Sequence, residues 1–271
     1  MLTTGWTCMR IWIRHLAFSL ALLIAAPLAH ADDSTADRRH IFATDWGLTL
    51  KSDGTGFYND LAQLLFSTEM GAIDYEILPY RRAKRHFFEE YGACLYPSSV
   101  EYLTSTGDIT DTDTFIGSRS VLSNKIHIFS RHGTTPPENY AALKGKRIAY
   151  AMGSRIPFAL EGTNAFFIAV ADEVDKAEML LTGRVDMISA AMPDVKFVFD
   201  SLGVPLAPFD ETLVVAGSGI GLVCHNTVAN AAFLASFETR LENLLKSGEL
   251  QVFLRNQGLD PKDYLRKTDT R

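Results

Sequence analysis

The sequence predicts an α/β fold whose strands are largely parallel, and three observations favour this class. Short apolar runs alternate along the chain with segments of helical periodicity, which is typical of βα units. Hydrophobic residues make up 47% of the chain, enough for sizeable buried cores. A strand-like segment at 214–223 carries glycine at every second position near its end, and a long amphipathic helix follows it.

The first 31 residues have the order of a secretory signal. A positive flank precedes an apolar run at 16–28, and a small-x-small motif ends at Ala31. The run is too short, and too soon followed by charge, for a membrane span. The alternative is a buried N-terminal helix. We expect cleavage after Ala31 and release into the periplasm, with either Met1 or Met9 as the true start.

The composition excludes nucleic acid as a partner. Removing 31 of the 271 residues leaves 240, and two of the 26 basic residues go with them while all 32 acidic residues stay, so the net charge becomes −8. An acidic chain without a basic stripe is a poor nucleic-acid binder. No spacing of His or Cys residues is typical of a metal site, so we expect neither metal nor cofactor.

Two cysteines remain after the signal, Cys94 and Cys224. Both lie in strand-like segments. Export makes a disulfide chemically feasible, and a pair of buried thiols is the alternative. The sequence leaves this choice open.

The first expected strand is 41–44. After a glycine-rich turn, a helix is expected at 57–66, because Phe57, Leu61 and Leu65 share one face. The elements that follow are a strand at 75–78, a basic helix at 81–91, a strand at 93–96, a polar stretch at 104–114, and two linked strands at 120–122 and 125–130.

A second unit begins after Pro136-Pro137. Its expected elements are a short helix at 139–144, strands at 147–151 and 166–171, a helix ending at 176–182, and strands at 185–190 and 205–208. The glycine-spaced strand at 214–223 follows. The helix at 228–246 is stopped by Ser247-Gly248, and a shorter helix covers 250–256.

Several segments, in this order, resemble landmarks of the type II periplasmic solute-binding proteins of the amino-acid-binding kind (family 3), and the likeness covers nearly all of the mature chain. They are Gly54-x-Gly56-Phe57-x-x-Asp60-Leu61, Pro79-Tyr80-Arg81-Arg82-Ala83, Leu143-Lys144-Gly145-Lys146-Arg147-Ile148-Ala149-Tyr150 with Gly153-Ser154 behind it, Gly183-Arg184-Val185-Asp186, and Gly217-Ser218-Gly219-Ile220-Gly221-Leu222.

The resemblance implies two lobes, each a mixed sheet flanked by helices, joined by a two-strand hinge. Lobe one would be 38–122 plus 217–271, and lobe two 123–216. It further implies a monomer that captures a small polar ligand, anionic or zwitterionic, by hinge closure, without catalysis. The captured ligand would be passed to a permease of the ABC importer type or reported to a sensor.

Candidate polar contacts lie in two loops. In the loop after the strand at 147–151, backbone amides, the Ser154 hydroxyl and the Arg155 guanidinium are suited to an anion. Ser98 and Ser99 occupy the place of the family's serine-rich contact loop. The alternatives are an ordinary turn at each place, with Arg155 solvated.

Candidate ligand walls are the aromatic residues at strand ends, namely Trp46, Tyr80 and Tyr96. Simple packing beneath a loop is the alternative for each. On the basic helix, Arg81 either reaches the cleft or belongs to a solvated face.

Two departures from the family pattern leave the ligand identity open. The family arginine that clamps an α-carboxylate falls on Thr104, and the family aspartate that holds an α-amino group falls on Ala191. Asp194, three residues later, either substitutes for that aspartate or caps the helix that Pro193 starts.

Two other functions stay open. A dehydratase-like cleft enzyme would need an acid or base in the cleft, and Glu101 is the candidate. A degenerate domain that binds a protein partner is the second.

Overall fold

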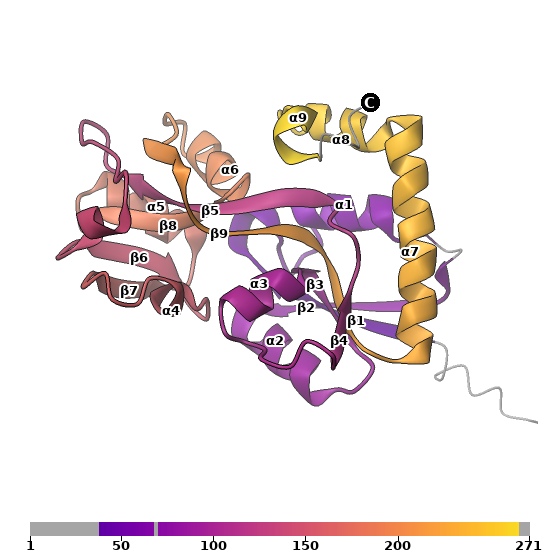
Figure 1. Ribbon diagram of the computed structural model, residues 1–271. Helices are drawn as coiled ribbons and strands as arrows, with labels where there is room; N and C mark the ends of the chain where they lie inside the picture. Colours follow the sequence, from indigo (N-terminus) through magenta and orange to yellow (C-terminus); the bar gives the residue numbers. More distant parts are fainter. Residues whose placement is uncertain (1–37, 68–69, 266–271) are drawn as a thin grey trace, which may run out of the picture. The chain divides into compact units, whose positions relative to one another are not determined.

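The computed structural model describes residues 38–67 and 70–265 (Figure 1). The expected signal and its cleavage site therefore lie outside the described residues. Within that part of the chain, no helix combines the length and the apolar character needed to cross a membrane.

The strands follow one path in the order β2-β1-β3-β9-β5-β8-β6-β7, and β4 pairs with β9. Pairing is parallel between β1 and its neighbours and between β6 and its neighbours, and antiparallel wherever β9 or β5 takes part. The predicted class, an α/β fold with mixed sheets, is confirmed. The strands are β1 (Arg39–Asp45), β2 (Ile73–Pro79), β3 (Cys94–Ser98), β4 (Phe115–Gly117), β5 (Leu122–Ser130), β6 (Arg147–Ala151), β7 (Phe166–Val170), β8 (Met187–Met192) and β9 (Phe209–His225).

Helices flank both ends of this path (Figure 1). The helices are α1 (Phe57–Leu65), α2 (Tyr80–Glu89), α3 (Val100–Ser105), α4 (Ile156–Ala159), α5 (Glu173–Leu181), α6 (Asp194–Ser201), α7 (Val228–Ser247), α8 (Glu249–Asn256) and α9 (Pro261–Tyr264), with 3-10 turns η1 (Gly47–Thr49) and η3 (Tyr140–Leu143). The longest, α7, begins where the Thr227 hydroxyl accepts from the Asn230 amide. It ends at Gly248, whose φ of +78° is a left-handed conformation that glycine adopts without strain.

The described chain has separate cores on the two sides of the β5–β9 pair. Leu61 and Leu65 of α1 pack with Phe237 and Leu241 of α7 in one cluster. A different cluster joins α5, α6 and the strand β8. The described residues nevertheless fall in one compact unit, because the sheet is continuous between the clusters.

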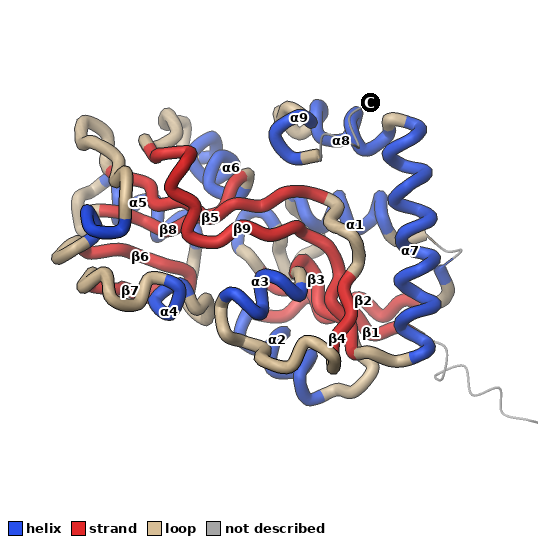
Figure 2. Tube along the Cα trace, in the orientation of Figure 1, coloured by secondary structure: helices blue, strands red, loops and turns tan. Residues whose placement is uncertain are grey.

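β5 and β9 run side by side between these cores (Figure 2). Their register aligns Leu122 with Ile220 and Ile126 with Ala216. At its other end β9 pairs with β3, so it belongs to both parts of the sheet. Gly219 is required here, since a Cβ atom on it would lie 1.3 Å from the Ser120 hydroxyl oxygen.

A disulfide joins Cys94 on β3 to Cys224 on β9, directly opposite each other in the antiparallel pair. Of the two alternatives that the sequence left open, the structure has the bridge. It ties the start of β3 to the last residues of β9, beside the start of α7.

Three local expectations were wrong. Residues 205–208 form no strand, because prolines at both ends lack the N–H that a ladder needs. The Pro208 carbonyl accepts from the Ser130 amide, and the Pro205 carbonyl is bonded to the His132 ring. The two strands at 120–122 and 125–130 are a single β5 from Leu122, since its polar middle pairs with β9. The polar stretch after 104 begins inside a helix, α3, which Ser99 caps.

Candidate functional site

A small cavity of about 70 Å³ lies where β1, β2, β3 and β8 end, beside the paired strands β5 and β9. Side chains at the carboxyl ends of parallel strands converge, and ligands commonly bind at that edge. The described residues that line it are Thr44, Trp46, Tyr58, Tyr80, Pro97, Ser98, Tyr102, Asn124, Ile126, Ala191, Asp194, Ala216, Gly219 and Ile220.

An aromatic wall forms one side of the cavity. The ring centroids of Trp46 and Tyr80 are 4.9 Å apart with planes tilted by 58°, and the Tyr80 and Tyr102 hydroxyl oxygens are 3.3 Å apart. Burial raises the pKa of Tyr80 well above its ordinary value of 10.0, so this hydroxyl stays neutral. The structure thus places Trp46 and Tyr80 at the cavity, and their role as walls for a ligand stays a prediction.

Tyr96 lies elsewhere. Its side chain is wholly buried in the core, and its hydroxyl donates to the Tyr58 carbonyl at 2.9 Å. Tyr96 is therefore behind the cavity wall and not among the lining residues.

Asp194 is the acid among the described lining residues, and it is 2% exposed. One carboxylate oxygen accepts from the Thr49 hydroxyl of η1 at 2.6 Å, and the other accepts from the Tyr58 hydroxyl of α1 at 2.8 Å. Burial raises its pKa from 3.8 to about 6, against the lowering effect of the two hydroxyl donors. Asp194 is the first residue of α6 and makes no cap bond there, so the capping alternative is wrong.

Sequence reasoning missed the two partners of Asp194. Thr49 and Tyr58 lie 145 and 136 residues before it. No local pattern marks a hydroxyl that will meet a carboxylate over such a separation.

Ser98, the last residue of β3, and Ser99, which follows it, have different roles. Ser98 lines the cavity and is 7% exposed. The hydroxyl of Ser99 accepts from the Tyr102 amide at 3.1 Å and so begins α3. Ser99 therefore positions Tyr102, and Ser98 faces the cavity.

Ser154 lies one layer behind the cavity. It is buried, and its hydroxyl is hydrogen-bonded to Tyr102, whose pKa is raised by burial and lowered in part by Tyr80 and Ser154. Ser154 contacts a lining residue and is not itself one.

The two candidate arginines also lie outside the cavity. The Arg155 side chain is exposed, and its guanidinium carbon lies 4.9 Å from the centre of the Phe158 ring. Arg81 is exposed on α2, and its aliphatic stem covers Gly153, where an added Cβ would be 2.5 Å from the Arg81 Cγ. Neither is among the lining residues.

Two buried lysines are each paired with a carboxylate. Lys84 lies 2.5 Å from Asp108, and burial lowers the pKa of the lysine. Lys176 lies 2.6 Å from Glu173 and donates to the Ser189 carbonyl at 2.8 Å. In each pair the neighbouring carboxylate already compensates the charge of the lysine.

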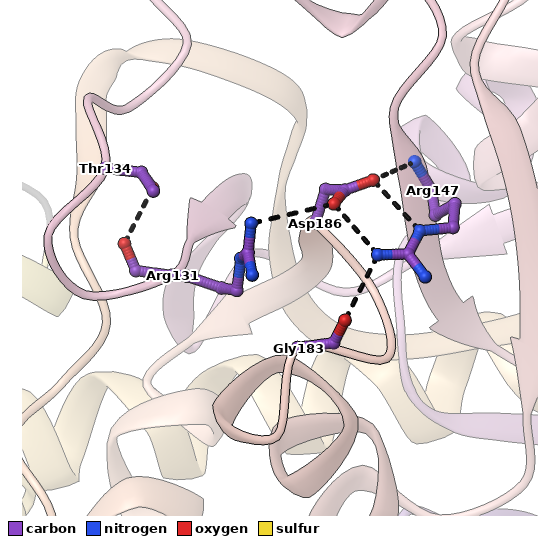
Figure 3. Close-up of polar contacts among 5 residues, drawn as sticks. All are labelled: Arg131, Thr134, Arg147, Gly183 and Asp186. Atoms are coloured by element: carbon purple, nitrogen blue, oxygen red, sulfur yellow. Dashed lines mark hydrogen bonds and ion pairs between the residues drawn. The ribbon is translucent and has the colours of Figure 1, made fainter.

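The aspartate of the Gly183-Arg184-Val185-Asp186 motif has a structural role (Figure 3). Arg131 and Arg147 approach Asp186 from opposite sides, at 3.8 Å and 3.0 Å. Arg147 also donates to the Gly183 carbonyl at 3.1 Å. Its hydrogen bonds lower the Asp186 pKa to about 2. This cluster fixes the entry to β8, at the end of the strand opposite the cavity.

Within the part of the chain that the structure describes, no group of three or more His, Cys, Asp or Glu side chains is arranged to hold a metal ion. The cavity thus offers aromatic faces, neutral hydroxyl and amide groups, and one carboxylate that already has two donors.

No protein-family model matches this sequence, and the search of curated proteins finds no match. Solved structures do match. A mutant of ArgBP from T. maritima has a TM-score of 0.64 and 14% identity, over 83% of this chain and 96% of that chain. The GluR0 ligand-binding core from Nostoc punctiforme, in complex with L-glutamate, has a TM-score of 0.63 and 16% identity, over 80% and 98%.

A histidine kinase sensor domain with similarity to periplasmic binding proteins has a TM-score of 0.62 and 16% identity, over 83% of this chain and 98% of that chain. Identities this low establish the fold and leave the ligand undetermined. The chain therefore has the two-lobed fold of the type II periplasmic amino-acid-binding proteins.

Proposed function

We propose that this protein is an exported periplasmic solute-binding protein that captures a small solute between two lobes. Lobe one is 38–122 plus 217–271, and lobe two is 123–216. The observation that carries the proposal is the composition of the cavity wall. Trp46 and Ser98 belong to lobe one, and Ala191 and Asp194 belong to lobe two. A solute in this cavity therefore contacts both lobes at once.

The paired strands β5 and β9 are suited to act as the hinge, because the chain passes from one proposed lobe to the other within them. Contacts across the seam support a closed state, among them the hydrogen bonds from Thr49 and Tyr58 to Asp194. A solute that binds the closed state better than the open one shifts the population toward it. Its recipient would be a permease of the ABC importer type or a membrane sensor, which would recognise the closed monomer.

Trp46 provides a direct assay. Two of the three tryptophans fall within the predicted signal, so Trp46 alone remains in the mature chain, at the cavity wall. We expect a cognate metabolite to change Trp46 emission and to raise the free energy of unfolding by about 2.7 kcal/mol at about 100 times its dissociation constant. Small-angle X-ray scattering should show a smaller radius of gyration on binding.

Tyr80→Ala should weaken this binding, since the Tyr80 ring packs at 4.9 Å from Trp46. Tyr91→Ala is the matched control, because Tyr91 is 76% exposed and does not line the cavity. If a broad panel of metabolites changes neither the emission nor the stability, the solute-binding proposal is wrong and a protein partner becomes the better hypothesis.

We propose binding without catalysis. Glu101, the acid that the sequence offers for a cleft enzyme, is exposed on α3 and is not among the lining residues. A bound metabolite should be recovered unchanged after long incubation with the protein. Its conversion to a product would contradict this part of the proposal.

A further inference from the structure

We infer that the captured solute is uncharged, and that Asp194 enforces this selectivity because both of its carboxylate oxygens are bonded to Thr49 and Tyr58. The inference rests on the proposed function, since it names the solute class for the same cavity. It differs from the anionic or zwitterionic ligand that the family resemblance implied.

The cavity has no counter-charge for an anion. None of the described lining residues is Arg, Lys or His. Arg155 is directed toward Phe158, and Lys84 is paired with Asp108 at 2.5 Å. A carboxylate brought out of water without a cationic partner is strongly disfavoured.

The cavity is also poorly suited to an ammonium group. Asp194 would be its natural partner, but two neutral hydroxyls already donate to the carboxylate, at 2.6 Å and 2.8 Å. Because the residue is 2% exposed, little oxygen surface is left for a ligand. An ammonium would have to displace the Thr49 or the Tyr58 hydroxyl from Asp194. The hydrogen bonds of these hydroxyls to Asp194 also join the two proposed lobes.

What the cavity does offer is neutral. Trp46 and Tyr80 present aromatic faces, and Ser98, Thr44 and Asn124 carry hydroxyl and amide groups. Such groups match a small ring or planar skeleton that bears a hydroxyl, carbonyl or amide. This is the class of solute that the geometry favours.

The test uses the mature protein and series of compounds that share a skeleton and differ in charge. Benzamide, benzoate and benzylammonium form one series, and small cyclic amides and diols with their charged counterparts form others. L-glutamate and L-arginine complete the panel. Trp46 emission and calorimetry should show a neutral compound as the tightest ligand, at least about tenfold tighter than its charged counterparts.

Two variants test the role of Asp194. In Thr49→Val/Tyr58→Phe the carboxylate loses both donors, and ammonium compounds should gain at least about tenfold in affinity. Asp194→Asn removes the negative charge, so the variant no longer repels an anion, and the affinity gap between benzamide and benzoate should narrow by at least about threefold. This second variant tests the role of Asp194 if the double variant does not fold.

The outcomes are distinguishable. If the tightest ligand is an anion, a cation or an amino acid, the inference is wrong while the proposed solute capture stands. The same holds if Asp194→Asn leaves the affinity gap between benzamide and benzoate unchanged. If no compound of any charge binds, the proposed function fails and this inference fails with it.

Discussion

Asp194→Asn should change how the stability of this protein depends on pH. The carboxyl group is buried, and its pKa rises from 3.8 to about 6 on folding. The folded chain therefore holds a proton that the unfolded chain has released, and stability falls as pH rises through this interval. This loss of stability is absent well below pH 3.8 and reaches its full size once the pH is more than about one unit above 6.

The structure sets the size of the effect. A difference between 3.8 and about 6 corresponds to about 3 kcal/mol of destabilisation at neutral pH. Most of it develops between about pH 4 and about pH 7.5. An asparagine does not ionise, and its amide can both accept from one of the two hydroxyls and donate to the other. The variant should therefore lack this component of the pH dependence.

Urea unfolding followed by Trp46 emission would measure the free energy of unfolding at each pH. The stability of the variant relative to the original chain should rise by about 2 to 3 kcal/mol over that range. Asp186→Asn is the control. In the original chain Arg147 lowers the pKa of the Asp186 carboxyl to about 2, so the contribution of this carboxylate to stability is lost only in more acidic solution. If Asp194→Asn and the original chain have parallel profiles, Asp194 is not a buried acid with a raised pKa, and the reasoning is refuted.

Two further predictions concern the sheet. Replacing Cys94 and Cys224 together by alanine should lower the free energy of unfolding by about 4 kcal/mol, because the bridge closes a long loop in the unfolded chain. Equal melting temperatures for the variant and the original protein without reductant would contradict this. Gly219→Ala should lower the free energy of unfolding by about 1–3 kcal/mol, because the new Cβ atom would clash with Ser120. Gly217→Ala should lower it less, since the nearest atom to its Cβ would be 3.4 Å away. Equal melting temperatures for the two variants would show that β9 shifts to accommodate the methyl group without cost.

The sequence by itself determined the class of fold and most of its elements. Apolar runs bounded by glycine and proline located β1, β6 and the long β9, and the periodic spacing of Phe233, Phe237 and Leu241 located α7. These features depend on neighbours within a few turns of the same segment. The same local reasoning failed at 205–208, where the prolines made the strand assignment wrong.

Only the tertiary structure decided which strand-end residues face the cavity. Tyr80 follows β2 directly and Tyr96 lies near the end of β3, yet Tyr80 lines the cavity and Tyr96 lies in the core. Arg155 has the chemistry of an anion ligand and is directed toward Phe158. The partners of Asp194 are more than a hundred residues away. Local pattern identifies what a side chain can do, whereas packing between distant segments decides what it meets.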